Sequence, residues 1–270
     1  MFMVPHSNQL TSPLLTTFKS ITLLLALASG LFTINPLHAN HELQVTESTQ
    51  AIFGNWIIDT SEKITLLQLN PDHSYLHIEF NLLEPQNSVA EWGRIDIHPS
   101  GVRFIPSYSN NSRQGLVAYQ MNRPKLQMAL TLESAKLVFT IDTNADSVMD
   151  EQHDYQAYPI QSIYGVWHQQ MTSALSSLLL LDNGYYAVVN INVHQDPQAH
   201  PHYTHLQWGH FDIQQHQLFI SPIFDNHPQQ SVSQLGILQS IFYHQRSQQL
   251  ALSFDSDKDN LSDRFQLFTR

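Results

Sequence analysis

The chain has 270 residues, of which 42% are hydrophobic and 10% aromatic; this is enough to bury one large or two small cores and is not typical of a disordered protein. It contains no cysteine, which excludes disulfides, thiolate metal sites and cysteine nucleophiles. Its formal net charge of −11 disfavours binding to nucleic acid and to anionic lipid, so neither is an expected partner.

The N-terminal segment, residues 1–39, predicts a cleavable signal peptide. Lys19 is its only charged residue, and the apolar run "SITLLLALASGLFTI" (20–34) is short for a membrane span. The small-residue pattern "LHA" (37–39) favours cleavage after Ala39, with an uncleaved anchor as the alternative. Export without cysteine favours a bacterial periplasm or exterior, with no stable membrane insertion after cleavage.

A short leader, residues 40–51, precedes segments that predict β-strands. These segments are short, they alternate or are rich in β-branched and aromatic residues, and turn residues such as "NPDH" and "EPQNS" separate them. Examples in the first unit are "ITLLQLN", "SYLHIEFN", "GRIDIH" and "VRFIPSY". Hairpin turns are expected around residues 133–135 and 245–248. After the signal, no window of twelve or more residues has convincing helical periodicity, although 170–181 is ambiguous.

The chain is predicted to be a tandem duplication, with units at 52–158 and 163–270. All four tryptophans belong to motifs that occur twice, "FGNW" with "YGVW" and "EWGRIDI" with "QWGHFDI". Other pairs follow in the same order, including "LVFTIDTNADSVMD" with "LALSFDSDKDNLSD". The link "YPIQSI" (158–163) is short enough that the two units should be in contact. About eight strands per unit predict an all-β protein of two antiparallel barrels.

A G-x-W motif on the first strand of each unit, followed by up-and-down strands, resembles the lipocalin or calycin-like barrels. The resemblance implies that this tryptophan packs across the closed end of the barrel, beneath an arginine from a late strand. Arg264 would be that arginine in the second unit, and His153 or Gln152 would take its place in the first. The alternative is ordinary core packing of large aromatic side chains. The structural signature residues are Gly54, Trp56, Trp92, Gly165, Trp167 and Trp208.

Two acidic loops have the spacing D-x-D/N-x-D-x-x-x-D, which suits the oxygen ligands that calcium prefers. The candidate ligands are Asp142, Asn144, Asp146 and Asp150 in the first unit and Asp255, Asp257, Asp259 and Asp263 in the second. Ser147 or Asn260 stands where such loops usually have glycine, and the flanking strands exclude an EF-hand. Calcium binding, if present, should be weak, in the range of about 10⁻⁴–10⁻³ M. The alternative is a solvated acidic turn.

Other candidates for chemistry are histidines and isolated acids. His194, His200, His202, His205 and His210 cluster in a Gln/His-rich stretch that is typical of an exposed polar loop but offers ligands for zinc or copper. Three acids, Glu79, Glu84 and Glu91, could pair in space, although nothing in the sequence brings them together. No nucleophile elbow, H-E-x-x-H, phosphate loop or dinucleotide motif occurs.

These observations predict an exported, non-enzymatic binding protein of two small barrels. Each barrel either holds a small apolar ligand, as the lipocalin resemblance implies, or is filled by its own side chains. The alternative is a cell-surface interaction module, adhesin-like or an enzyme inhibitor, that binds an envelope or surface protein and no small molecule.

Overall fold

The structure is a computed structural model that describes residues 51–98, 101–122, 126–170, 174–192, 204–226, 240–255, 259 and 261–270. The expected signal peptide and all but the last residue of the expected leader lie outside these ranges, as does Asp257 of the second acidic loop.

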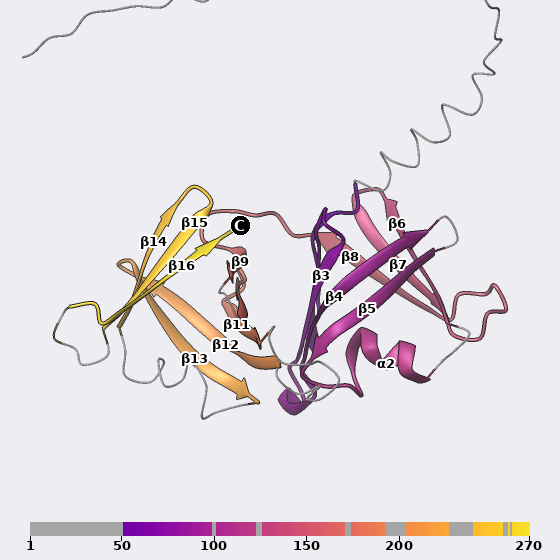
Figure 1. Ribbon diagram of the computed structural model, residues 1–270, viewed down its shortest axis with the longest axis horizontal. Helices are drawn as coiled ribbons and strands as arrows, with labels where there is room; N and C mark the ends of the chain where they lie inside the picture. Colours follow the sequence, from indigo (N-terminus) through magenta and orange to yellow (C-terminus); the bar gives the residue numbers. More distant parts are fainter. Residues whose placement is uncertain are drawn as a thin grey trace, which may run out of the picture.

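The first unit is a sheet of eight antiparallel strands with a short helix. Its strands have the sheet order β5-β4-β3-β2-β1-β8-β7-β6, so consecutive strands are neighbours and β1 also pairs with β8. No ladder joins β5 to β6, and this barrel is therefore nearly closed. Helix α2 connects these two strands and lies at one end of the barrel (Figure 1). The elements are β1 Gly54–Asp59, β2 Lys63–Leu69, β3 Ser74–Asn81, the 3-10 turn η1 Pro85–Asn87, β4 Val89–His98, β5 Gly101–Ser109, α2 Gly115–Asn122, β6 Gln127–Glu133, β7 Lys136–Asp142 and β8 Glu151–Ala157.

The second unit is a closed eight-stranded antiparallel barrel with the same succession of neighbours. Its strands are β9 Gly165–Gln170, β10 Ala174–Leu180, β11 Tyr185–Asn192, β12 Thr204–Gln214, β13 Gln217–Asp225, β14 Ser240–Arg246, β15 Gln249–Asp255 and β16 Arg264–Thr269. The predicted all-β class and the two tandem barrels are confirmed. The ambiguous stretch 170–181 contains a strand, β10.

Both predicted hairpins are present, and their turns use residues with a left-handed backbone. Ser134 (φ 49°) and Ala135 (φ 67°) connect β6 to β7. In the second unit Ser247 (φ 55°) lies in the turn between β14 and β15. Two-residue turns of this kind match the right-handed twist of the strands they join, so they set the register of each hairpin.

The duplication is visible in individual hydrogen bonds. Asn110 accepts the Ala90 N–H at 2.7 Å and donates to the Ser88 carbonyl at 3.1 Å. Asn226 makes the same pair of bonds to Leu206 and Thr204, at 2.8 and 2.9 Å. A register shift follows the tryptophan of β4 and again that of β12, between Trp92 and Gly93 and between Trp208 and Gly209. The two units are therefore copies of one structure.

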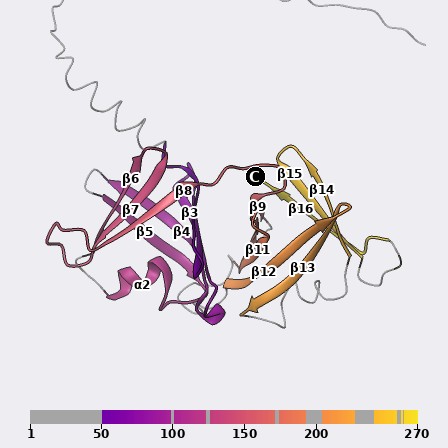
Figure 2. The same cartoon turned by 180° about the vertical axis from the view of Figure 1, so that it is seen from behind.

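The two barrels pack side by side and share an apolar core (Figures 1 and 2). Strand β2 is buried at five of its seven positions, because one face lines its own barrel and the other faces the second barrel. This two-sided burial accounts for runs such as "ITLL", in which apolar residues do not alternate with polar ones. The shared core includes Ile64, Leu66, Ile78 and Phe80 from the first barrel and Leu179, Val189, Leu206 and Trp208 from the second.

Candidate functional site in the first barrel

A cavity of about 540 Å³ opens at the end of the first barrel beside α2. Successive inward positions on β3 place His77 and Glu79 in its wall, and β2 contributes Lys63 and Thr65. Strand β8 adds Glu151, His153 and Tyr155, again at every second position. Because side chains of a strand alternate between faces, this spacing aims all of them into the barrel. Apolar walls are formed by Ile58, Leu116 and Phe139.

Glu91 on β4 lies beside the cavity, at the start of helix α2. Its side chain is fully buried, and its two carboxylate oxygens accept the N–H groups of Leu116 and Val117, each at 3.0 Å. These N–H groups have no partner within the helix, and the positive end of the helix dipole favours a negative charge there. Gly115, with a φ of 72°, allows this approach, because a Cβ on it would lie 2.7 Å from the Glu91 carboxylate.

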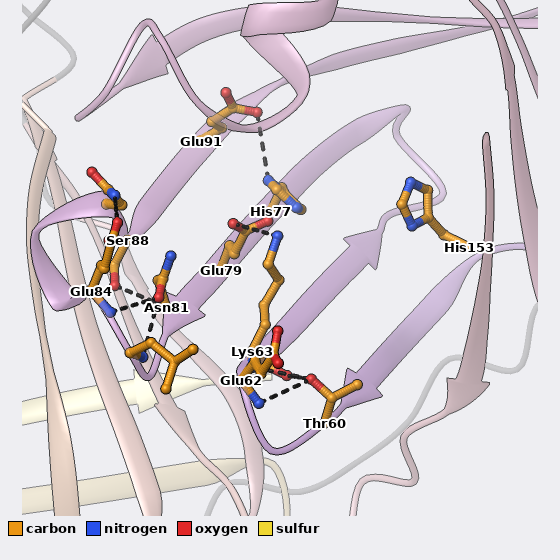
Figure 3. A network of polar contacts seen from close by, with 12 residues as sticks. Thr60, Glu62, Lys63, His77, Glu79, Asn81, Glu84, Ser88, Glu91 and His153 are labelled. Carbon is orange, nitrogen blue, oxygen red and sulfur yellow. Dashed lines mark hydrogen bonds and ion pairs between the residues drawn. The ribbon is translucent and has the colours of Figure 1, made fainter. Parts of the chain in front are cut away.

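His77 pairs with Glu91 across the β3–β4 ladder. Its Nδ1 lies 3.6 Å from Glu91 Oε2, too far for a hydrogen bond, and this atom is buried without a hydrogen-bond partner. The side chain is only 3% exposed yet lines the cavity, and Figure 3 shows it between Glu91 and the Glu79–Lys63 pair. Buried polar atoms are almost always hydrogen-bonded, so an unpartnered one in a cavity wall marks a place where a ligand can bind.

Glu79 and Glu151 provide the carboxylates that face the cavity from opposite strands. Lys63 Nζ lies 2.9 Å from Glu79 Oε1; the Glu79 side chain is 13% exposed and that of Lys63 is 47% exposed. Glu151 accepts the hydroxyl of Tyr119 at 2.7 Å and lies 3.6 Å from His153 Nε2. Burial raises the pKa of Tyr155, and the negative charge of Glu79 raises it further, so this phenol stays neutral and can donate.

The four signature tryptophans lie outside the cavity. Trp56 and Trp167 are buried in the barrel cores, and each donates its indole N–H to a carbonyl four residues earlier, that of Ile52 or Ile163, at 2.7 Å. Trp92 and Trp208 contribute to the core between the barrels instead. Gly54 and Gly165 have φ angles of 149° and 121°.

Arg270, and not Arg264, is the arginine that covers the G-x-W tryptophan of the second barrel. Its guanidinium lies 3.7 Å from the ring centre of Trp167 and donates to the Ser162 and Tyr164 carbonyls. Arg264 begins β16 and pairs with Phe254, whereas β9 pairs with the other end of β16, at Thr269. The expectation for Arg264 was therefore wrong, because it assigned the role to the wrong end of the strand.

In the first acidic loop, side-chain oxygens bond to the loop's own backbone. Asp142 is fully buried, and its Oδ1 accepts the N–H groups of Asn144 at 3.1 Å and Ala145 at 2.7 Å. Its Oδ2 accepts that of Ser147 at 2.8 Å, and Ser147 has the left-handed backbone (φ 69°) that the sixth position requires. Asp150 Oδ2 accepts the Thr143 N–H at 2.8 Å.

The second loop repeats part of this arrangement. The Asp259 carboxylate accepts the Leu261 N–H at 2.8 Å, as Asp146 does for Val148. The Asp263 N–H donates to the Phe254 carbonyl at 2.8 Å, and in the first loop the Asp150 N–H donates to the Ile141 carbonyl at the same distance. Within the described ranges, no group of three or more His, Asp or Glu side chains is placed to hold a metal ion. Calcium binding by these loops stays a prediction.

Of the clustered histidines, His205 and His210 are described and the other three lie outside the described residues. His205 is buried, with Nε2 3.0 Å from Asp225 Oδ1 and Nδ1 3.2 Å from Asn190 Nδ2. Gln207 also donates to Asp225, at 3.1 Å. His205 therefore belongs to a polar network inside the second barrel and not to an exposed loop. His210 packs on Tyr185, with ring centres 4.4 Å apart.

Of the three acids singled out in the sequence, Glu79 lines the cavity, Glu91 lies behind its wall at the start of α2, and Glu84 is not part of the lining. Four residues of the cavity lining have no sequence pattern that predicts this site: Lys63, Tyr119, Glu151 and His153. One signal was available: "YLHIEF" places a histidine and a glutamate two apart on one face of an otherwise apolar strand. Polar residues at inward positions of a barrel strand are costly unless they are hydrogen-bonded or reached by water or a ligand, so this pair is a signal for a polar cavity.

A comparison with protein-family models found no match, and a comparison with curated proteins found none. Among solved structures, the DNA polymerase sliding clamp from Pseudomonas aeruginosa matches with 9% sequence identity and a TM-score of 0.13. The match covers 81% of this chain and 76% of that one. At this TM-score it supports no conclusion about fold or function. No helix in the described part of the chain has the length and apolar character needed to cross a membrane.

Proposed function

We propose that this chain is an exported, non-enzymatic binding protein that holds a small molecule in the first barrel. The observation that carries the proposal is the cavity of about 540 Å³, whose apolar walls surround a few convergent polar groups. Small-molecule sites commonly have this size and this mixture, and barrel mouths commonly house them. The charged groups favour an amphipathic ligand over the purely apolar one that the lipocalin resemblance implies.

The lipocalin-like relationship is part of this proposal. The arginine stacked on the G-x-W tryptophan of the second barrel agrees with the pattern that the resemblance implies. The same type of residue is missing from the corresponding place in the first barrel, where the residue paired with Trp56 is Ala157. The first barrel therefore departs from the pattern while keeping its indole hydrogen bond.

The test is a fragment screen by ligand-observed NMR with the protein expressed without its N-terminal 39 residues. The control is Ala118→Trp, which fills the cavity from helix α2. We expect some fragments to bind the wild type and to show no binding to the Ala118→Trp variant. If every bound fragment survives the substitution, or none binds, the cavity is not a ligand site.

A second candidate, an interaction module at the cell surface, is favoured by the outer face of the second barrel. Phe219, Phe242, Phe265 and Leu267 are exposed there, at 47%, 36%, 63% and 42%. Phe242 and Phe265 both pair with Ser253 of β15, so they flank it on one face of the sheet. Exposed apolar groups of this kind mark binding surfaces. The test is a pull-down from envelope extract with the wild type and with the double variant Phe242→Ser/Phe265→Ser. A protein that binds the wild type and not the double variant supports the interaction module.

A further inference from the structure

The cavity floor is rich in hydrogen-bond acceptors. The carboxylate of Glu79 lines the cavity and is 13% exposed, and His77 beside it separates the cavity from the fully buried carboxylate of Glu91 (Figure 3). By contrast, the two cations of the lining, Lys63 and Arg113, are both exposed residues. Buried negative charge is costly unless cations or N–H groups compensate it. Glu91 has two N–H groups of α2, whereas Glu79 has a salt bridge with the half-exposed Lys63.

The position of Glu91 selects the tautomer of His77. Its negative oxygen faces Nδ1 at 3.6 Å, so a proton on Nδ1 is favoured over a lone pair there. In the neutral ring the other nitrogen, Nε2, is then an acceptor. None of the described residues bonds to His77 Nε2, and the ring lines the cavity. The floor thus offers a free acceptor beside a carboxylate.

We propose that the ligand is a small amphipathic cation, a primary amine or a guanidine on an apolar body. Its charged group replaces the Lys63 ammonium at Glu79 and donates a hydrogen bond to His77 Nε2. Its apolar body lies against Ile58, Leu116 and Phe139. Lys63 can leave because its side chain is flexible and 47% exposed, so water solvates its ammonium group while the cation of the ligand takes its place at Glu79. This inference rests on the proposed function of the cavity.

The equivalent place in the second barrel has different polar side chains. There, Asn190 occupies the position of Glu79 and Gln207 that of Glu91. These two side chains bond within the network of His205 and Asp225. In this network His205 and Gln207 hold the Asp225 carboxylate, although Gln207 Oε1 is itself buried without a partner. The first barrel has a histidine, His77, at the cavity wall whose buried Nδ1 has no hydrogen-bond partner.

The experiment is isothermal titration calorimetry with three probes of similar size and different charge: 2-phenylethylamine, 2-phenylethanol and 3-phenylpropanoate. We expect the amine to bind at least about tenfold more tightly than the alcohol, since a hydrogen bond to a charged group has this effect on affinity. We expect no saturable binding of the carboxylate. Tighter binding of the carboxylate or the alcohol would overturn the inference and leave the cavity as a binding site. Failure of all three would contradict both proposals.

Two substitutions change amine affinity in opposite directions. Glu79→Gln should weaken binding at least about tenfold, because it removes the charged acceptor. Lys63→Gln should strengthen it, because it removes the competing internal cation. Glu133→Gln and Lys136→Gln, at an exposed hairpin pair, are the matched controls and should leave affinity unchanged. If Lys63→Gln weakens amine binding, the ligand does not replace Lys63 and the inference is wrong.

Discussion

Trp208 of the second barrel donates its indole N–H to the hydroxyl of Ser88 in the first barrel, at 2.9 Å. Both side chains are almost completely buried, and Ser88 Oγ also accepts the N–H of Asn81 at 3.0 Å. The indole stacks on Phe80, with ring centres 5.2 Å apart and planes 22° apart. This junction is asymmetric, because Trp92, the equivalent of Trp208, tilts against Tyr108 of its own barrel.

Ser88→Ala tests the contribution of this junction to stability. The substitution removes the acceptor of the buried Trp208 indole N–H and of the partly buried Asn81 N–H, and we expect the free energy of unfolding to fall by about 1–3 kcal/mol. Urea denaturation followed by tryptophan fluorescence measures the change. Ser61→Ala, in an exposed turn, is the control. Equal effects of the two variants would mean that the junction contributes nothing.

Gly115→Ala tests the close approach of α2 to Glu91. A Cβ would lie 2.7 Å from Glu91 Oε1 and 2.9 Å from Val89 Cγ1, on a backbone with φ of 72°. Gly184→Ala is the matched control, since φ is 85° there but the nearest atom lies at an ordinary 3.6 Å. We expect both substitutions to lower the free energy of unfolding by about 1–2 kcal/mol, the cost of a side chain on a left-handed backbone. Gly115→Ala should lower it further because of the close contacts. Thermal melting of the two variants measures the difference. A smaller fall in melting temperature for Gly115→Ala than for Gly184→Ala would contradict the close approach of α2 to Glu91.

Arg270→Ala tests the cover on Trp167. It removes a cation stacked at 3.7 Å from the ring and the donors to two backbone carbonyls. We expect a loss of about 1–3 kcal/mol in unfolding free energy. Arg264→Ala should change it by less than about 0.5 kcal/mol, because Arg264 is an exposed surface residue. A larger loss for Arg264→Ala than for Arg270→Ala would mean that Arg264, and not Arg270, covers Trp167.

We expect His168, which lies at the contact between the barrels, to make stability depend on pH. It bonds to Ser177 Oγ at 2.9 Å and, across the junction, to Gln68 Oε1 at 3.0 Å. Burial lowers the pKa of His168 below its usual 6.5, so the unfolded chain binds the proton more readily than the folded one. The neutral imidazole therefore supports folding above pH 6.5, and this support is lost as the pH falls below it.

We expect the melting temperature of the wild type to fall more steeply than that of His168→Gln on going from about pH 7.5 to about pH 5.5. His244→Gln, which changes an exposed histidine, should follow the wild type. Parallel curves for the wild type and His168→Gln would contradict this role.

Asp142→Ala should destabilise the first barrel whether or not calcium binds. Its carboxylate is buried and accepts three backbone N–H groups at 2.7–3.1 Å, which the substitution leaves unpaired. We expect a loss of at least about 1–3 kcal/mol. Thr131→Ala, at an exposed strand position, is the control. Melting with and without millimolar calcium tests the ion separately: a rise in the wild type is the predicted result, and no shift would count against both loops.

Much of the architecture could be predicted from local patterns. The strands "ITLLQLN" and "SYLHIEFN" are β2 and β3, and the turn at Ser134 and Ala135 is where the residue spacing predicted it. These features depend on residues close in sequence, whose alternation and backbone preferences act locally. The duplication was visible for the same reason, since it repeats a local order.

The candidate site was less accessible to sequence reasoning. Glu79 was recognised as an acid, but its place in one cavity with Glu151 and Tyr119 depends on the pairing of β1 with β8. Arg264 and Arg270 lie six residues apart on one strand and its end, and only the register of β16 against β9 shows which one reaches Trp167.

The amino-acid sequence by itself determined that this protein is a repeated, tryptophan-marked set of short antiparallel strands, because strand and turn preferences belong to neighbouring residues. Only the tertiary structure decided which faces of those strands are covered. Leu66 packs against the other barrel and Leu67 fills its own, although both are equally apolar and equally buried. Contact partners are set by barrel closure and by the docking of two units, which bring together side chains far apart in the chain.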